Sequence, residues 1–365
     1  MIRSYLFLSL FVLFCQLCLG QPDSRQVKII SDLQKELTND LKKDNLHGSL
    51  SAAIVEKGKV IWAGACGYAS YDKDIPADTG TIYRICSITK MFTVTLLMQL
   101  VEEGKVKLDD LAETYVPEIK LLPGYDKQTR FTLQQLASHT SGLDREPQGI
   151  PDLSFGPVDK WEEKVLALIP HVSFHSSPGE QFSYSNVGFA LLGLALERAA
   201  DKPYVQLVQE RIFTPLNMNN SFFAVPGDKR DRLAPGIEYR TGIINTQTPL
   251  RQIDGMGYRV PNGGIWSTPV DLARFEIAFM NGTLIKAASI RKMLEIPSGS
   301  RSYGMGMMIM RDNSLTMIGH DGSDPGYTSQ FSIDPKTGNA VILLRNCRPG
   351  ATDLISTTRD VLRRL

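Results

Sequence analysis

Residues 50–68 read LSAAIVEKGKVIWAGACGY, two apolar runs with Lys57-Gly58 between them. Apolar runs of this length divided by a short polar turn that contains glycine predict a β-hairpin. Just before it, residues 27–43 repeat apolar side chains with the spacing of a helical face, so a leading helix is expected there. The chain therefore opens as a helix followed by two antiparallel strands.

The other end of the chain also reads as strands. Short apolar runs follow one another, separated by Asn313, Gly322 and Thr337-Gly338, and residues 351–365 predict a closing helix. The expected strands are 303–310, 315–318, 327–333 and 340–344. Helical patterns fill the middle at 88–103, 132–138, 159–168, 187–199, 203–213 and 269–280.

This order predicts an α+β fold, an α/β sandwich in which both chain ends build one antiparallel sheet that helices cover. The sheet lobe is expected over about residues 21–90 and 300–365. A mostly helical lobe, about residues 91–299, is inserted between these two parts. A ligand cleft is expected where the helical lobe meets the sheet.

The first 20 residues have the pattern of a signal peptide. Arg3 precedes an apolar run over 5–14, and Cys18 and Gly20 offer small side chains for cleavage after Gly20. The run is shorter than the roughly 18–20 residues of a membrane-spanning helix. We expect a secreted or periplasmic protein, with a membrane anchor or a lipid on Cys15 or Cys18 as alternatives.

Composition indicates an ordinary globular protein, with 42% hydrophobic and 22% charged residues. The net charge is +1, from 40 basic and 39 acidic residues, and no basic stripe suggests nucleic acid as a partner. A small-molecule or peptide substrate is expected, without cofactor or metal, and oligomeric state is left open. His171 and His175 have a zinc-like spacing but no evident third ligand.

After removal of the leader, Cys66, Cys86 and Cys347 remain, too few for a disulfide framework. A Cys66–Cys347 bridge and buried thiols are both open. Asn219 and Asn281 begin glycosylation sequons, which have meaning only in a eukaryote.

The sequence Ser87-Ile88-Thr89-Lys90 opens an apolar helix. A serine in the first turn of a helix lies among unpaired backbone N–H groups at the positive end of the helix dipole. Lys90, three residues later, lies on the same face and reaches the Ser87 oxygen. Burial and the helix dipole lower the pKa of a lysine, which then accepts the serine proton. An N-cap serine beside a surface lysine is the structural alternative.

Tyr184-Ser185-Asn186 precedes another apolar helix. In extended chain, residues two apart point the same way, so Tyr184 and Asn186 are expected to face one cleft. Tyr184 relays the serine proton to a leaving group if nearby positive charge lowers its pKa from about 10. Asn186 donates to a substrate carbonyl and accepts from Lys90.

His320-Asp321-Gly322-Ser323 is the third element. Gly322 in a strand edge permits close approach of another backbone. The Ser323 N–H, together with the Ser87 N–H, is expected to form an oxyanion hole. His320 is expected near the leaving group as a polar or proton-sharing side chain. A polar hairpin turn is the alternative.

In this order the three elements resemble one family: the class C β-lactamase, D-alanyl-D-alanine carboxypeptidase and esterase group of serine hydrolases. That family carries Ser-x-x-Lys, then Tyr-x-Asn, then Lys/His-Thr/Ser-Gly on a strand. Further matches are Leu136-Ala137-Ser138-His139-Thr140-Ser141-Gly142-Leu143, Pro215-Leu216-Asn217-Met218 and Gly263-Gly264-Ile265-Trp266-Ser267-Thr268. The resemblance covers about residues 45–345 and implies a β-lactamase/transpeptidase-like fold with catalytic roles for Ser87, Lys90 and Tyr184.

One departure bears on the substrate. The family's third motif is usually Lys-Thr-Gly in β-lactamases, whereas this chain has His320 and Asp321 there. A carboxylate at 321 repels an anionic antibiotic or a D-Ala terminus unless the side chain turns away. We therefore expect an esterase, amidase or peptidase-like enzyme acting through a serine acyl-enzyme. The alternatives are a β-lactamase or penicillin-binding carboxypeptidase, and a non-catalytic penicillin sensor or binding protein.

Overall fold

The computed structural model describes residues 22–365, except 45, 71–72, 241–242, 247–249 and 313. The predicted signal peptide, with Arg3, Cys15, Cys18 and Gly20, lies outside the described residues. Within the described part, none of the helices combines the length and apolar character needed to cross a bilayer.

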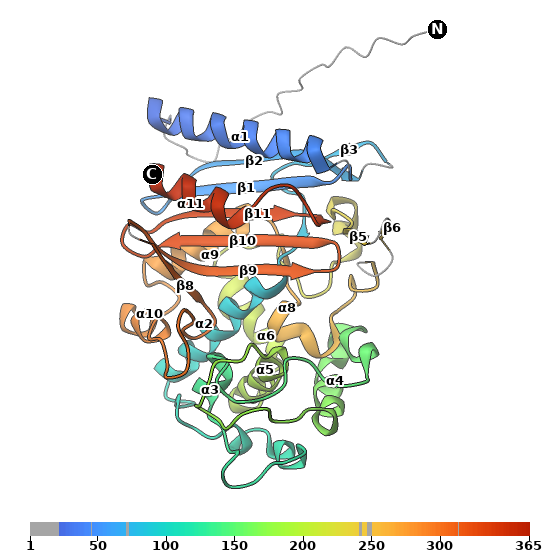
Figure 1. The fold of residues 1–365 in the computed structure, drawn as a ribbon, viewed down its shortest axis with the longest axis vertical. Helices are drawn as coiled ribbons and strands as arrows, with labels where there is room; N and C mark the ends of the chain where they lie inside the picture. Colours follow the sequence, from blue (N-terminus) through green and yellow to red (C-terminus); the bar gives the residue numbers. More distant parts are fainter. Residues whose placement is uncertain (1–21, 45, 71–72, 241–242, 247–249, 313) are drawn as a thin grey trace.

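The main sheet has seven strands in the order β3-β2-β1-β11-β10-β9-β8, and each strand is antiparallel to its neighbours. Strands β1 and β11, from opposite ends of the sequence, pair at its centre from Leu50↔Arg345 to Val55↔Ala340. The prediction of one antiparallel sheet from both chain ends is confirmed (Figure 1). The strands are β1 (Ser49–Glu56), β2 (Lys59–Ser70), β3 (Ile75–Pro76), β8 (Met308–Arg311), β9 (Thr316–Asp324), β10 (Tyr327–Asp334) and β11 (Asn339–Arg345).

Helices cover both faces of this sheet because successive strand residues point to opposite sides. Leu50 and Leu343 pack with α1 (Ser24–Asp44) and α11 (Leu354–Arg364) on one face. Ala53 and Ile342 belong to the larger core on the other face, which contains α9 (Pro269–Met280). The leading and closing helices expected from the sequence are confirmed, and they lie against the same face.

The helical lobe is built around α2 (Thr89–Glu102) and α5 (Asn186–Ala200), which contact each other. It extends away from the sheet (Figure 1). Further helices in the described part of this lobe are α3 (Leu133–Ala137), α4 (Trp161–Leu168), α6 (Tyr204–Val208), α8 (Val260–Gly263) and α10 (Ala287–Met293). Two small sheets join the lobes: β4 (Tyr83–Arg84) with β7 (Trp266–Ser267), and β12 (Cys347–Arg348) with β5 (Ile237–Arg240) and β6 (Ile243–Asn245).

Three predicted elements differ from the structure. The strand expected over 303–310 shrinks to β8, because Gly306 has a φ of +67° and turns the chain just before it. Gly322 does not divide two strands; it lies inside β9, opposite Ser329, and the turn comes after Asp324. The helix expected over 203–213 is α6 followed by a π-helical turn.

Cys66, Cys86 and Cys347 are all free thiols in this fold. Burial raises the pKa of the Cys66 thiol to about 11 and those of Cys86 and Cys347 to about 12. Of the two possibilities left open by the sequence, the structure has free thiols, with Cys347 buried and Cys66 partly buried.

Candidate active site

Ser87 is the one partly exposed residue of the buried segment 81–98. It lies in η1 (Cys86–Ile88), a short 3-10 turn that leads into α2. Ser87 is half-buried, whereas all other residues from 81 to 98 are buried. Cys86, directly before it, has a φ of +51°, a conformation that is rare outside glycine and concentrated at functional sites. The turn therefore brings the Ser87 hydroxyl out of the core.

Lys90 lies one helical turn after Ser87 and has no exposed surface. Its Nζ atom lies 3.2 Å from Ser87 Oγ, 2.8 Å from Asn186 Oδ1 and 2.9 Å from the carbonyl oxygen of Asn262. These partners come from η1, α5 and α8, so three separate segments converge on one amine. The surface lysine of the structural alternative is ruled out.

The partners of Lys90 fit an uncharged amine. The Asn186 amide nitrogen donates to Glu146 Oε1 over 2.6 Å, which leaves its oxygen facing Lys90. That oxygen and the Asn262 carbonyl can only accept hydrogen bonds. A neutral amine satisfies both with its two N–H groups, and its lone pair is then left for the Ser87 hydroxyl.

The surroundings of Lys90 also favour the neutral form. Burial is the largest cause that holds the pKa of Lys90 well below its usual value, and the Arg259 guanidinium adds to it. Arg145 acts in the same direction, while the carboxylates of Glu146 and Asp321 oppose it. An ammonium group is costly without water and beside other cations, so the proton is easily lost.

Tyr184 and Asn186 are brought to the same amine, as the sequence predicted from their spacing. Ser185 between them is extended and caps α5 by accepting from the Gly188 N–H over 2.9 Å. Lys90 Nζ lies 4.7 Å from the centroid of the Tyr184 ring. The two side chains therefore reach Lys90 from adjacent positions at the start of one helix.

The lowered pKa on which the expected proton relay by Tyr184 depended is not found. Burial raises this pKa above its usual value, and Asp321 adds to the rise. A hydrogen bond with Ser87 and the cations of Arg145 and Arg259 oppose burial without cancelling it. Tyr184 is therefore a protonated phenol, a donor rather than a base, at neutral pH.

Gly322 brings β9 against the turn that carries Ser87. A Cβ atom at this position would overlap the carbonyl oxygen of Ile85 and the hydroxyl of Ser329. Only glycine permits this approach. Ser323, the next residue, is exposed, and its backbone N–H lies one position along the strand from the contact. The two N–H groups predicted for the oxyanion hole thus belong to neighbouring segments.

His320 lies in β9, two residues before Gly322, and is fully buried. Its Nδ1 lies 2.5 Å from the carbonyl oxygen of Asp321, and its Nε2 lies 3.0 Å from the hydroxyl of Tyr303. Its ring centroid is 6.2 Å from that of Tyr184. Both ring nitrogens are thus occupied within the protein, and the imidazole packs in an aromatic group with Tyr184 and Tyr303.

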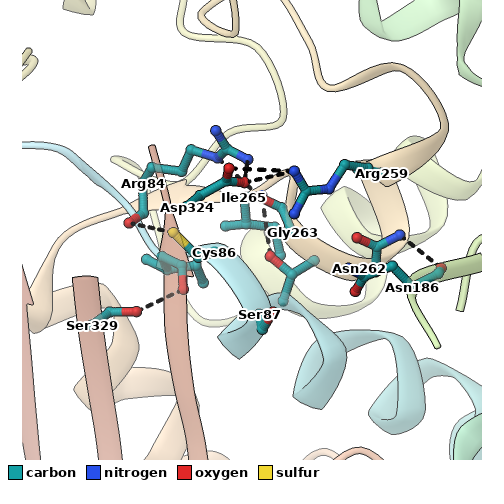
Figure 2. A network of polar contacts seen from close by, with 12 residues as sticks. Arg84, Cys86, Ser87, Asn186, Arg259, Asn262, Gly263, Ile265, Asp324 and Ser329 are labelled. Carbon is teal, nitrogen blue, oxygen red and sulfur yellow. Dashed lines mark hydrogen bonds and ion pairs between the residues drawn. The ribbon is translucent and has the colours of Figure 1, made fainter. Parts of the chain in front are cut away.

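A buried ionic network lies beside the nucleophile and was not predicted from the sequence. Asp324 Oδ2 lies 2.5 Å from Arg84 Nη2 and 3.0 Å from Arg259 Nη1. Figure 2 shows the two guanidinium groups meeting the carboxylate, with Ser87 nearby. Burial raises the pKa of Asp324, but Arg259 and Arg84 outweigh it and hold the pKa below its usual value. The group carries two positive charges against one negative charge.

The site also contains residues that had no recognisable signal. Glu146 accepts from Asn186 and from the Tyr258 hydroxyl, and it lies in a loop with no periodic pattern. Asn262 directly precedes the Gly263-Gly264 pair of a family motif, which was the available signal for this position. Arg259 lies three residues earlier, and a lone arginine in a loop has no sequence signature.

Metal chemistry has no visible basis in the part of the chain that the structure describes, where no three His, Cys, Asp or Glu side chains are grouped to hold an ion. His171 ends a short 3-10 turn, and His175 follows outside any helix. The zinc-like spacing of these two residues is therefore not presented by a helical face.

The family is decided by a match over nearly the whole chain. The sequence model of the family described as Beta-lactamase matches residues 35–364. The chain belongs to the beta-lactamase family. Members of this family include serine hydrolases such as the D-alanyl-D-alanine-carboxypeptidase/endopeptidase AmpH of Escherichia coli (strain K12), which is 28% identical over 305 residues and covers 76% of each chain.

A further relative is Beta-lactamase-like protein 4 of Dictyostelium discoideum. It is 29% identical over 344 residues, which are 86% of this chain and 59% of that protein. For Beta-lactamase-like protein 2 of the same organism the share is 63%. This beta-lactamase family chain thus spans about three-fifths of the length of these two relatives.

Solved structures show the same architecture. The octameric penicillin-binding protein homologue from Pyrococcus abyssi has a TM-score of 0.77 and 26% identity, and the match covers 91% of this chain and 76% of that chain. The D-amino acid amidase from Ochrobactrum anthropi SV3 has a TM-score of 0.76 over 92% of this chain and 99% of that chain. At 24% identity, the second likeness shows the fold alone.

Proposed function

We propose that this chain is an exported serine hydrolase that cleaves an ester or amide through an acyl-enzyme on Ser87. The observation that carries the proposal is the Lys90 amine, which is buried, surrounded by acceptors and cations, and 3.2 Å from the Ser87 hydroxyl. A hydroxyl next to a neutral amine loses its proton as it attacks a carbonyl.

Lys90 is the base of the first step. Its lowered pKa leaves it unprotonated, whereas Tyr184 has a raised pKa and keeps its proton at neutral pH. When the surroundings move the pKa values of two groups apart, the group with the lowered pKa acts as the base and the group with the raised pKa acts as the acid. As Ser87 attacks the carbonyl, its proton passes to Lys90.

Tyr184 is the acid that completes the acylation. Its phenol hydrogen bonds with Ser87 and lies beside Lys90, so it donates a proton to the departing alcohol or amine and is reprotonated from Lys90. The backbone N–H groups of Ser87 and Ser323 stabilise the developing oxyanion. Water then attacks the acyl-enzyme with the same groups in reverse order, which releases the acid and restores Ser87.

Two carboxylates near the site disfavour substrates that carry a carboxylate close to them. The Asp321 and Glu146 side chains are 44% and 42% exposed. Burial is the largest influence and raises the pKa of Asp321, but the hydrogen bond with His320 and smaller contributions from neighbouring groups together hold the pKa below its usual value, so Asp321 is anionic at pH 7. An anionic group placed near either carboxylate is repelled. We therefore place neutral or cationic esters and amides ahead of β-lactams and peptides with a free D-Ala carboxylate.

Labelling with a fluorophosphonate probe tests the nucleophile. Wild-type protein is expected to gain one label, located on Ser87 by peptide mass spectrometry, and to hydrolyse p-nitrophenyl esters. Ser87→Ala is expected to lose both properties, whereas the control Ser24→Ala, at an exposed serine that begins α1, keeps them. Ester turnover that survives in Ser87→Ala rejects the assignment.

A substrate panel separates this proposal from its alternatives. Short neutral esters and amino-acid amides are expected to turn over faster than nitrocefin or D-Ala-terminated peptides. Preference for nitrocefin indicates a β-lactamase. A stable adduct with fluorescent penicillin and no ester turnover indicates a penicillin sensor. Recovery of protein that begins at Gln21 outside the expressing cell tests export.

A further inference from the structure

His139 binds the chain on both sides of Tyr184. Its carbonyl oxygen accepts from the Ser183 N–H over 2.8 Å, and its Nδ1 accepts from the Ser185 N–H over 3.0 Å. Its ring lies against the Tyr184 ring, with centroids 4.2 Å apart and planes tilted by 32°. One residue therefore fixes the peptide groups before and after the phenol and also contacts its face.

His139 is itself held rigidly. It has no exposed surface and a φ of +58°, which a histidine keeps only when its surroundings impose it. The rings of Phe189 and Tyr303 pack against it, with centroids 5.0 Å and 4.8 Å from its own. The neighbouring Thr140 N–H is bound to the carbonyl oxygen of Gln135 at 2.9 Å. A residue held this rigidly can fix the position of the segment that it binds, here residues 183–185.

The imidazole of His139 acts as an acceptor and not as a charge. Because Nδ1 accepts a hydrogen bond, the ring proton is on Nε2, which is buried without a hydrogen-bond partner among the described residues. Burial is the largest cause that holds the pKa of His139 well below its usual value, and the Arg145 guanidinium acts in the same direction. Protonation of Nδ1 would direct an N–H at the Ser185 N–H, so the neutral form is required.

We infer that His139 is a positioning residue that places the Tyr184 phenol for proton transfer to the leaving group. This inference rests on the proposed function, because it assigns His139 to the acid of that reaction. It goes beyond a role in folding the Ser141-Gly142 loop, since the bonds run to Ser183 and Ser185. Loss of the acceptor is expected to slow substrates whose leaving group needs a proton and to spare those whose leaving group does not.

The test compares His139→Gly, which tolerates the positive φ but lacks the acceptor, with His139→Asn. Asparagine also adopts positive φ, and its Oδ1 replaces Nδ1 as acceptor. For alkyl esters or amides, kcat of the glycine variant is expected to fall at least 30-fold with KM changed less than 3-fold (about 2 kcal/mol in the barrier). For p-nitrophenyl esters and fluorophosphonate labelling, the loss is expected to stay below about 5-fold, because these leaving groups depart without an acid. The asparagine variant is expected to recover most of the alkyl-ester activity.

A double-mutant cycle with Tyr184→Phe separates positioning from general support of the fold. When the phenol is absent, His139→Gly is expected to cause no further loss on alkyl esters. An equal loss in the Tyr184→Phe background, or an equal loss on all leaving groups, overturns the inference. A His139→Asn variant that loses as much alkyl-ester activity as His139→Gly also overturns the inference. If His139→Gly does not fold, His139→Asn is compared directly with wild type, and a large loss of its alkyl-ester activity overturns the inference. Failure of wild-type protein to be labelled on Ser87 contradicts the proposed function instead, so the two failures are distinguishable.

Discussion

The Nζ atom of Lys90 lies 3.2 Å from Ser87 Oγ, and its two other partners, Asn186 Oδ1 and the Asn262 carbonyl, can only accept. This arrangement directs the amine lone pair at the serine. It also requires that Lys90 stay uncharged inside the core. The protonation state of Lys90 therefore affects the free energy of unfolding as well as the catalytic rate.

Lys90→Met is expected to abolish turnover and to change how stability depends on pH. The folded-state pKa of Lys90 is lowered from 10.5, so below pH 10.5 the unfolded chain binds a proton that the folded chain does not. Wild type therefore loses stability relative to Lys90→Met as pH falls from about 10.5 towards the folded pKa. Urea denaturation at pH 7 and pH 10 checks this: the difference in unfolding free energy should favour the methionine variant more at pH 7. A difference that does not vary with pH contradicts a neutral Lys90.

Arg259 and Glu146 are expected to shift the acidic limb of the pH–kcat/KM profile in opposite directions. After burial, Arg259 is the largest influence that lowers the pKa of Lys90, and Glu146 raises it. Arg259→Gln therefore moves the limb to higher pH, and Glu146→Gln moves it to lower pH. Profiles measured with a p-nitrophenyl ester and read at the isosbestic wavelength of p-nitrophenol provide the check, because this leaving group departs without an acid. Shifts of the same sign in both variants would exclude Lys90 as the titrating group.

Asp324→Asn is expected to destabilise the fold by about 3–5 kcal/mol, because it leaves the Arg84 and Arg259 guanidiniums buried without their carboxylate. The control is Glu163→Gln, which removes an exposed ion pair with Lys160 and is expected to change stability far less, because water screens an exposed pair. Thermal or chemical denaturation compares the two. Equal, small effects would mean that the network adds nothing to stability.

Gly322→Ala is expected to reduce kcat/KM by at least 100-fold (about 3 kcal/mol), since the new methyl group displaces β9 from the Ile85 carbonyl and the Ser87 turn. Gly227→Ala is the matched control, because a Cβ atom there meets nothing within 4 Å. Steady-state kinetics on a neutral ester decides the matter. Unchanged activity in Gly322→Ala would show that close packing of β9 against the Ser87 turn is not needed for catalysis.

The fold could be predicted from the sequence because its signals are local. The hairpin of β1 and β2, the C-terminal strands and the amphipathic leading and closing helices all follow from apolar periodicity. Their pairing across the sheet followed from the order of elements. The strand ends near Gly306 and Gly322 were predicted wrongly. Gly306 turns the chain, whereas Gly322 lies within a strand and permits close contact with a neighbouring backbone, and the sequence does not distinguish these two uses of glycine.

The site was predictable only where residues lie close in sequence. Ser87 with Lys90, and Tyr184 with Asn186, are separated by less than one turn, so their spacing carries information. Arg259 and Glu146 reach Lys90 through folding alone, and no pattern in their own segments marks them. The direction of the Tyr184 pKa was wrong for a related reason: it is set by burial, which a sequence does not state.

The most direct test of a neutral Lys90 is the rate at which a fluorophosphonate labels Ser87 as a function of pH, followed by intact-protein mass spectrometry. With a neutral Lys90, the labelling rate should rise and then level off, with a midpoint well below pH 10.5, and the Lys90→Met variant should lack this plateau. A wild-type rate that climbs in step with hydroxide beyond pH 10, matched by the methionine variant, would contradict a neutral Lys90.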